Sequence, residues 1–284
     1  MARRNAADAP RGPLFHYTSQ NAFESIITSE QFWYTSIYHM DDTEELNFGF
    51  DVCRSLLQTN LERADKAERL FIEPLIETGF REEIRSVVEF YSISFGTRDD
   101  QKQWARYGDK CKGVAFGLSV DFFQPLALEN PKPDELIFFG KVAYGEKSAK
   151  AKHSPIIQST LDFIKREHLA GSIPEGRIAQ ALFRRLLAEM YVEVLWNCVT
   201  SKSDDWRHQN ETRLLVLNRL KDPHLTVSND RDRPYVKIPQ PTLKRSLREV
   251  MVGPAADEGA EDNVRAILTK QNLGGIPVTR SAGT

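Results

Sequence analysis

The chain has 284 residues, of which 40% are hydrophobic and 27% are charged, and its formal net charge is -2 at pH 7. This composition supplies enough apolar material for one large domain or two small ones, so we expect a globular protein. The balanced charge excludes a global electrostatic bias toward nucleic acids or anionic membranes.

Cysteine usage and hydropathy predict a cytoplasmic protein without membrane contact. The three cysteines, Cys53, Cys111 and Cys198, are odd in number, far apart and without CxxC spacing. Neither a disulfide framework nor a zinc knuckle is indicated, and a reducing cytoplasm fits best. No stretch approaches the roughly 18 apolar residues of a spanning helix. Because the start of the chain is charged and lacks an apolar region, we expect a flexible tail at residues 1–12 and a single domain at residues 13–284.

The first elements along the chain are expected to be two strands separated by a short helix. LFHYT, residues 14–18, and QFWYTS, residues 31–36, have the composition of strands. A long amphipathic stretch at residues 44–89 then predicts two or three helices, with breaks near Pro74 and Gly79.

The middle of the chain alternates between strand and helix signals. YSISF, residues 91–95, alternates polar and apolar residues as a half-buried strand does. Trp104 and Tyr107 are three positions apart, so they fall on one helical turn, and the strand GVAFGL follows. IFFGKVAY, residues 137–144, predicts one more strand.

The last part of the chain completes a mixed pattern. Ser154 and Pro155 form a suitable cap and first turn for a helix, a second helix is expected at about residues 175–199, and LLVL at 214–217 reads as a buried strand. Further signals are YVKI, EVMVG, a helix near residues 257–271 and IPVTR. Because helical insertions separate strand pairs irregularly, an α+β fold in one domain is favoured over a doubly wound parallel sheet.

The segment DDWRHQNETRLLVL, residues 204–217, holds the strongest candidate site. Its polar first half runs directly into an apolar strand, and Gln209, Glu211 and Arg213 stand two residues apart at the junction. Alternation would place all three side chains on one face of an extended strand. They form either a cross-strand polar ladder or a functional group of amide, carboxylate and guanidinium.

Other candidates have ordinary explanations beside the functional ones. His16 lies in the first strand, where a lone histidine is usually satisfied by its surroundings. The segment HMDDTEE could ligate a divalent metal, although an acidic cap and first turn of the following helix explain it better, so we expect no metal. The possible metal ligands in HMDDTEE are His39, Asp41, Asp42 and Glu44. No Walker loop, Rossmann glycine pattern, GxSxG elbow or HExxH helix occurs.

Several motifs together resemble the bacterial family called domain of unknown function 2971. FHYTS, FWYTS with a following acidic turn, YSISF, QWARYGDKCKGVAFGL, W..QNETRLLV and EVMVGPAAD occur in the order of that family, over roughly residues 13–280. The late family motif W-x-x-E-x-E-aromatic-R is matched at Trp206, Glu211 and Arg213, whereas Gln209 replaces its first glutamate and Thr212 its aromatic residue. The family turn N-D-P-x-E lacks its Asn and Pro here.

A strand with a basic residue, a strand with aromatic-Thr-Ser and a late strand headed by Gln-x-Glu follow one another along the chain. This order is similar to that of the ADP-ribosyltransferase superfamily, and the resemblance implies a function and a fold. It implies an α+β domain with a mixed or antiparallel split sheet, and NAD as the substrate. By motif position, Glu211 would be the catalytic carboxylate and Gln209 would select the acceptor. Arg213 would keep Glu211 ionised and oriented. The residues that would hold NAD and line its nicotinamide pocket are His16, Tyr17, Thr18, Tyr34, Thr35, Ser36 and Arg213.

Three classes of function therefore stay open. The first is an NAD-consuming enzyme that transfers ADP-ribose to a protein, a nucleic acid or water, for which the family resemblance implies a toxin or antiphage role. The second is a non-catalytic binding or regulatory domain of the same fold, and the third is a metal-dependent hydrolase. For the first class we predict that His16, Tyr34 and Glu211, although remote in sequence, meet in one cleft. The acceptor and the oligomeric state are left open.

Overall fold

The computed structural model describes residues 10–39, 43–77, 88–123, 137–169, 194, 196–219, 225–230 and 233–283. Most of the expected tail and most of the helix expected at 175–199 lie outside these residues. The strands are β1 (Leu14–Thr18), β2 (Gln31–Ser36), β3 (Val88–Phe95), β4 (Val114–Leu118), β5 (Ile137–Lys141), β6 (Ala143–Tyr144), β7 (Ser201–Lys202), β8 (Thr212–Arg219), β9 (Val227–Ser228), β10 (Tyr235–Pro239), β11 (Leu247–Val252) and β12 (Val278–Arg280). The helices are α1 (Gln20–Ser29), η2 (Ile37–His39), α2 (Thr43–Leu61), α3 (Lys66–Glu77), α5 (Gln101–Tyr107), α7 (Glu146–Leu169), η3 (Asp204–Gln209), α9 (Leu243–Ser246) and α10 (Ala260–Lys270).

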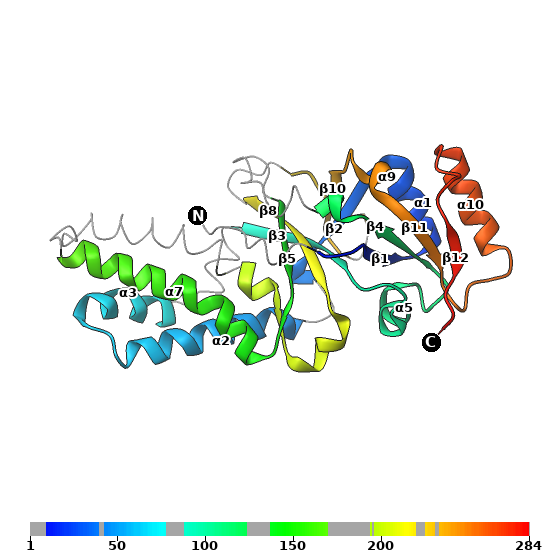
Figure 1. The fold of residues 1–284 in the computed structure, drawn as a ribbon. Coiled ribbons are helices and arrows are strands. Elements are labelled where there is room, and N and C mark those ends of the chain that lie inside the picture. Colours follow the sequence, from blue (N-terminus) through cyan, green and yellow to red (C-terminus); the bar gives the residue numbers. More distant parts are fainter. Residues whose placement is uncertain are drawn as a thin grey trace.

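Two larger sheets and one small one confirm the expected α+β class. One sheet has the strand order β1-β4-β11-β12 and the other has the order β5-β8-β3-β2-β10-β9. Their pairs are antiparallel except for β11 and β12, which run parallel. Strands β6 and β7 form a separate parallel pair. In Figure 1, helices α2, α3 and α7 form one end of the molecule, and the two larger sheets with α1 and α10 form the other.

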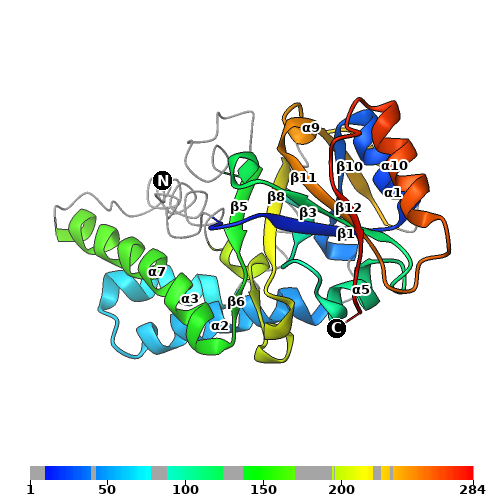
Figure 2. The ribbon, with the colours of Figure 1, turned by 45° about the vertical axis from the view of Figure 1, so that its right-hand side comes forward.

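Strand β1 joins the two larger sheets. Its Phe15 exchanges both backbone hydrogen bonds with Gly96, at 3.0 and 2.8 Å, just beyond the end of β3. The hydroxyl of Tyr17 donates to the carbonyl of Thr97 at 2.6 Å and accepts from the backbone N–H of Asp100 at 2.8 Å. Figure 2 shows β1 crossing in front of β3 and β8. The start of α5 is thereby fixed against both sheets.

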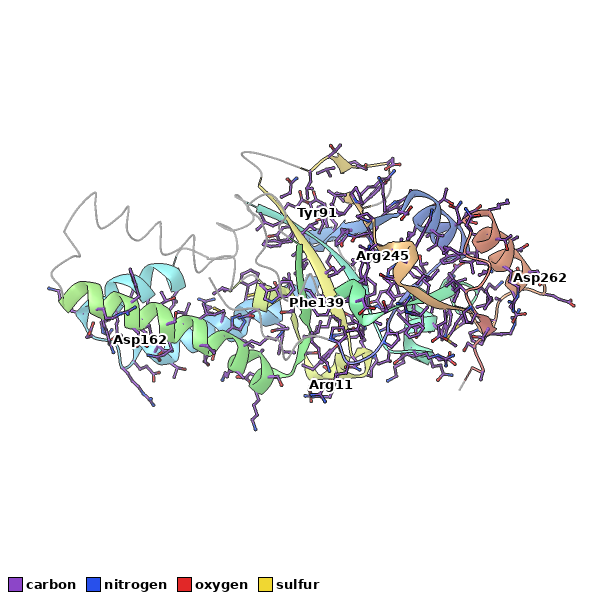
Figure 3. All side chains as sticks on the ribbon, turned by 45° about the horizontal axis from the view of Figure 1, so that its top comes forward. Arg11, Tyr91, Phe139, Asp162, Arg245 and Asp262 are labelled. Carbon is purple, nitrogen blue, oxygen red and sulfur yellow. The ribbon has the colours of Figure 1, made fainter. Side chains whose placement is uncertain are left out.

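Each face of the six-stranded sheet packs into a different hydrophobic cluster. Leu214 and Val216 of β8 belong to a cluster shared with the four-stranded sheet, α1 and α10, and this side is called the sheet-side face. Leu215 and Leu217 belong to a second cluster with α2, α3 and α7, and this side is called the helix-side face. Tyr91 and Phe139, labelled in Figure 3, are both on the sheet-side face. Strand alternation therefore assigns every residue of β8 to one of two environments.

Several expected elements are confirmed at the residues predicted. The strands at residues 14–18 and 31–36 are β1 and β2, and the helix between them begins after Ser19, whose hydroxyl accepts from the Ala22 N–H at 3.2 Å. The turn with Trp104 and Tyr107 is α5. Residues 137–144, expected as one strand, divide into β5 and β6, which belong to different sheets.

Two of the expected helix boundaries in the insertions were wrong, those at Pro74 and Ser154, whereas the break expected near Gly79 lies outside the described residues. Helices α2 and α3 separate at residues 62–65, where Asp65 and Glu68 each accept the other's backbone N–H at 2.9 Å, and this reciprocal cap fixes the start of α3. Pro74 lies within α3. Pro155 likewise lies inside α7, which begins at Glu146 rather than after Ser154.

His153 on α7 is an unusual buried residue. Its side chain is fully buried, and neither ring nitrogen has a hydrogen-bond partner among the described residues. Burial, and to a smaller extent the neighbouring charge of Lys152, lowers the pKa of His153 to about 4. The neutral ring is accommodated at pH 7, but protonation in the folded state is disfavoured.

We predict that His153→Leu makes the protein less sensitive to mild acid. Unfolded His153 regains its ordinary pKa of 6.5, so its contribution to stability is complete above pH 6.5 and declines as pH falls toward 4. At pH 5 the loss is about 2 kcal/mol. In denaturant unfolding, the free energy of unfolding should decrease less between pH 7 and pH 5 for the variant than for the wild type. Equal decreases would contradict the prediction.

Candidate functional site

The polar segment before β8 is shaped by a short helix and a left-handed residue. Residues Asp204–Gln209 form η3, and Asn210 follows with a φ of 41°, a conformation that asparagine tolerates better than most residues. The chain then enters the sheet: the N–H of Glu211 donates to the Tyr144 hydroxyl at 2.8 Å, and its carbonyl accepts from Val142 at 3.0 Å. These contacts fix the backbone of Glu211 before β8 begins at Thr212.

The carboxylate of Glu211 is buried and anchored through one oxygen. Its Oε2 accepts from Nε and Nη2 of Arg213 at 3.1 and 2.9 Å and lies 3.0 Å from Nζ of Lys202. Among the described residues, its Oε1 has one contact, at 3.5 Å from the hydroxyl of Tyr107. Burial alone would raise the pKa of Glu211, but Arg213 and Lys202 outweigh it and lower the pKa to about 2. The group is therefore an anion at all physiological pH values.

Gln209 joins this network from η3 rather than from the strand. Its side-chain Oε1 accepts from Lys202 Nζ at 2.7 Å, and its backbone carbonyl accepts from Nε2 of Gln103 at 2.9 Å. The expectation that Gln209, Glu211 and Arg213 share one strand was wrong, because only Arg213 lies within β8. The three side chains are nevertheless connected, because Lys202 binds both Gln209 and Glu211, and Arg213 also binds Glu211.

Two aromatic side chains and one cationic side chain lie together beside the network, which Tyr107 contacts. Tyr107, at the end of α5, is 37% exposed, and the exposed guanidinium of Arg106 lies 5.5 Å from its ring centre. The same guanidinium lies 4.7 Å from the ring centre of Trp206 in η3. We call Arg106, Tyr107 and Trp206 the Arg106 ridge. Tyr107 is its member nearest to Oε1 of Glu211.

A left-handed turn begins two residues after Tyr107, beyond Gly108. Asp109, Lys110 and Cys111 have successive φ values of 51°, 53° and 69°, a run that non-glycine residues rarely adopt. The turn is held because the Cys111 N–H donates to the carbonyl of Trp104 at 3.1 Å and its carbonyl accepts from Ala255 at 3.0 Å. The conformation of the chain after Tyr107 is thus set by contacts on both sides.

His16 lies in an aromatic environment away from this network. Its ring centre is 5.4 to 5.8 Å from those of Phe32, Phe95 and Phe116, and its Nδ1 donates to the carbonyl of Ser94 at 2.9 Å. Burial lowers the pKa of His16 to about 4, and the Ser94 hydrogen bond offsets this only in part. His16 is therefore neutral at pH 7.

Tyr34 and Ser36 of β2 are also buried. The Tyr34 hydroxyl accepts from Nε2 of Gln240 at 3.3 Å, and burial raises its pKa. Oγ of Ser36 donates to Oε1 of Glu89 at 2.9 Å. Oγ of Ser36 also lies 3.0 Å from Nδ1 of His39. Both side chains make these contacts inside the protein and neither contacts Glu211.

Strand alternation separates the expected site residues into two groups. Arg213 of β8 is paired with Ser94 of β3 and donates to the carbonyl of Val199 at 2.7 Å. Its side chain therefore lies on the helix-side face. Tyr34, and the phenylalanines around His16, belong to the sheet-side cluster. Thr18 is two positions from His16 in β1, and Ser36 is two positions from Tyr34 in β2, so each pair points to the same face of its strand. The expected single cleft of His16, Tyr34 and Glu211 is therefore not formed, because the motif comparison counted positions and did not assign faces.

Two of the expected cofactor residues do lie on the side of Glu211. The ring of Tyr17 packs edge-on against Trp104 of α5 at 5.0 Å, and α5 also carries Gln103 and Tyr107, which contact the network. Thr35 alternates with Tyr34 and pairs with Ser92, so it faces the helix side. Lys202 and Gln103 were not predicted as site residues. Gln103 opens the motif QWARYGDKCKGVAFGL, whereas Lys202 offers no signal beyond its polar character.

The candidate metal turn lies largely outside the described residues. Asp41 and Asp42 are not described, and His39 is exposed. Within the described ranges, no three His, Cys, Asp or Glu side chains are grouped as a metal site requires. The helices in the same ranges include none with the length and apolarity needed to cross a membrane.

Comparison with known proteins identifies one family. Residues 103–214 match the model of a family described as "Protein of unknown function (DUF2971)". The resemblance to this family is confirmed over that segment, which is shorter than the range of about 13–280 indicated by the motifs. The segment begins at Gln103 and extends just past Arg213, so it contains the whole network around Glu211. No curated protein and no solved structure matches the chain significantly.

We predict that Glu211→Gln destabilises the protein by roughly 3–5 kcal/mol at pH 7, because two buried cations lose their shared anion. The carboxylate has an ordinary pKa of 4.5 and a folded pKa of about 2, so its contribution is present above pH 4.5 and is lost between 4.5 and 2. At pH 4 the difference in the free energy of unfolding between wild type and variant should be smaller than at pH 7 by about 1 kcal/mol. Denaturant unfolding measures both values, and a change below about 1 kcal/mol at pH 7 would refute this account.

Proposed function

We propose that the chain is an NAD-consuming enzyme of ADP-ribosyltransferase-like fold, which transfers ADP-ribose to an acceptor or to water and in which Glu211 is the catalytic carboxylate. The observation that carries the proposal is the asymmetry of that carboxylate. Oε2 receives the N–H groups of Arg213 and Lys202, whereas the contact of Oε1 with the described residues is the long one to Tyr107. An anion anchored in this way keeps one oxygen for a ligand.

This arrangement suits the cleavage of the bond between ribose and nicotinamide. As that bond breaks, its electron pair leaves with nicotinamide and the ribose acquires oxocarbenium-like charge, which a fixed carboxylate stabilises. The acceptor then bonds to the ribose carbon and loses a proton. Glu211 needs no raised pKa for this role, and its lowered pKa keeps it ionised.

The ligand would have to reach Glu211 from the side of Tyr107. The carboxylate is fully buried, and Tyr107 is exposed and lies against its Oε1. Displacement of this one phenol ring would open the oxygen to a ligand. In this proposal Tyr17, Thr35 and Arg213 remain candidates for NAD contacts, whereas His16, Thr18, Tyr34 and Ser36 support the strands. A toxin or antiphage role would follow from NAD consumption.

A second candidate function is a non-catalytic binding domain. It is favoured by the complete burial of Glu211 and by the separation of His16 and Tyr34 from it. Tryptophan, tyrosine and arginine are the residues that dominate binding energy in protein interfaces, and the Arg106 ridge consists of these three types. In this alternative, Glu211 is structural and the ridge is the functional surface.

We predict that wild-type protein releases nicotinamide from NAD and that Glu211→Gln lowers the rate by roughly a hundredfold to a thousandfold. The dissociation constant for NAD should change much less, because the lost interaction belongs to the transition state. Glu68→Gln is the matched control. Glu68 is also a buried glutamate in an ion pair, with Lys165 at 3.0 Å, but it lies on α3.

Rates are to be normalised to the folded fraction, since both glutamine variants are expected to be destabilised. The control should then retain the wild-type rate. Equal rates for wild type and Glu211→Gln would make Glu211 a structural residue. No release by the wild type would transfer support to the binding domain.

A further inference from the structure

Lys202 connects the two candidate catalytic side chains. Its ammonium lies 2.7 Å from Oε1 of Gln209 and 3.0 Å from Oε2 of Glu211, and the residue is only 2% exposed. The backbone of Lys202 is fixed as well, because β7 pairs with β6 and the Gly145 N–H donates to the Lys202 carbonyl at 2.9 Å. One cation on a held strand thus binds both side chains.

The chemistry of the ammonium determines how the Gln209 amide is oriented. An ammonium has donors and no acceptor, so it must face the amide oxygen and not the amide nitrogen. Nε2 of Gln209 then points away from Lys202. Among the described residues no group accepts a hydrogen bond from Nε2, and this nitrogen is not among the fully buried polar atoms. It is therefore an available donor.

The same ammonium also affects which carboxylate oxygen is available. Lys202 and Arg213 both bind Oε2 of Glu211, so the cations concentrate on one oxygen. Oε1 is left toward Tyr107. A donor on Gln209 and an acceptor on Glu211 are consequently presented together, and both orientations depend on Lys202.

We propose that Lys202 is a positioning residue that sets the amide of Gln209 and the carboxylate of Glu211 as one unit. Its effect on turnover rests on the proposed function, whereas its effect on the orientation of Gln209 does not. Replacing Lys202 leaves both functional side chains in the chain but removes the group that orients them. Loss of such a supporting partner typically lowers activity about tenfold to a hundredfold.

The test compares Lys202→Met with Lys150→Met. Lys150 forms an exposed ion pair with Glu146 on α7 and serves as the matched control. Nicotinamide release is measured over a range of NAD concentrations, and the side-chain amide of Gln209 is observed by ¹⁵N NMR, assigned by its loss in Gln209→Leu. Lys202→Met should lower kcat by at least about tenfold with KM changed less. It should also shift the Gln209 amide signals, and Lys150→Met should do neither.

The two readouts separate the two proposals. If the wild type releases nicotinamide but Lys202→Met keeps its kcat and its amide signals, Lys202 is not a positioning residue. If the wild type releases none, the proposed function fails, and a shifted amide in Lys202→Met still supports the orientation by Lys202 while an unshifted one overturns it.

A second measurement applies if Lys202→Met does not fold. A buried, hydrogen-bonded ammonium exchanges its protons slowly, so the wild-type Lys202 Nζ signal should be visible at pH 7 and should shift in Gln209→Leu. Its absence, or its insensitivity to that substitution, would overturn the proposal.

Discussion

A carboxylate removed from water must be matched by cations, and this requirement organises the region around Glu211. The two cations that meet it come from different elements, Lys202 from β7 and Arg213 from β8. Taking all three charges out of water is costly, and good geometry with further hydrogen bonds is needed to offset that cost. Through Glu211, the ionic network links Lys202 of the short β6–β7 pair to Arg213 of the six-stranded sheet.

The same network determines which groups of the site are held in place. Glu211 is fixed in its backbone by Tyr144 and Val142 and in its side chain by Arg213 and Lys202. Glu211 is therefore held on this side through both its backbone and its side chain. The other carboxylate oxygen, Oε1, is contacted by the exposed Tyr107. A rigid charge beneath a displaceable ring suits either catalysis or selective binding.

Local pattern was sufficient for many elements but not for the assembly of the site. The strands at 14–18 and 31–36 and the α5 turn follow from composition and spacing, which are properties of neighbouring residues. The break between α2 and α3 was misplaced because proline was weighted above the reciprocal cap of Asp65 and Glu68. The cluster of Gln209, Glu211 and Arg213 was recognised, although Gln209 belongs to η3.

The remaining parts of the site depend on contacts that sequence spacing does not encode. Gln103 reaches the carbonyl of Gln209 across 106 positions, and Tyr144 reaches Glu211 across 67. The position of His16 illustrates a second difficulty, since a motif gives the residue but not the face of the strand. Only the packing of Phe32, Phe95 and Phe116 decides that His16 faces the interior.

The placement of the three cysteines has a practical consequence for observing this site. Burial raises the pKa of Cys53 to about 12 and raises that of Cys198 as well, so both thiols are poor nucleophiles at neutral pH. Cys111 is only half-buried and lies in the left-handed turn that follows Tyr107. A thiol-reactive fluorophore should therefore attach selectively at Cys111, four residues from the displaceable ring. The natural sequence thus contains its own attachment point for an optical reporter of ligand entry.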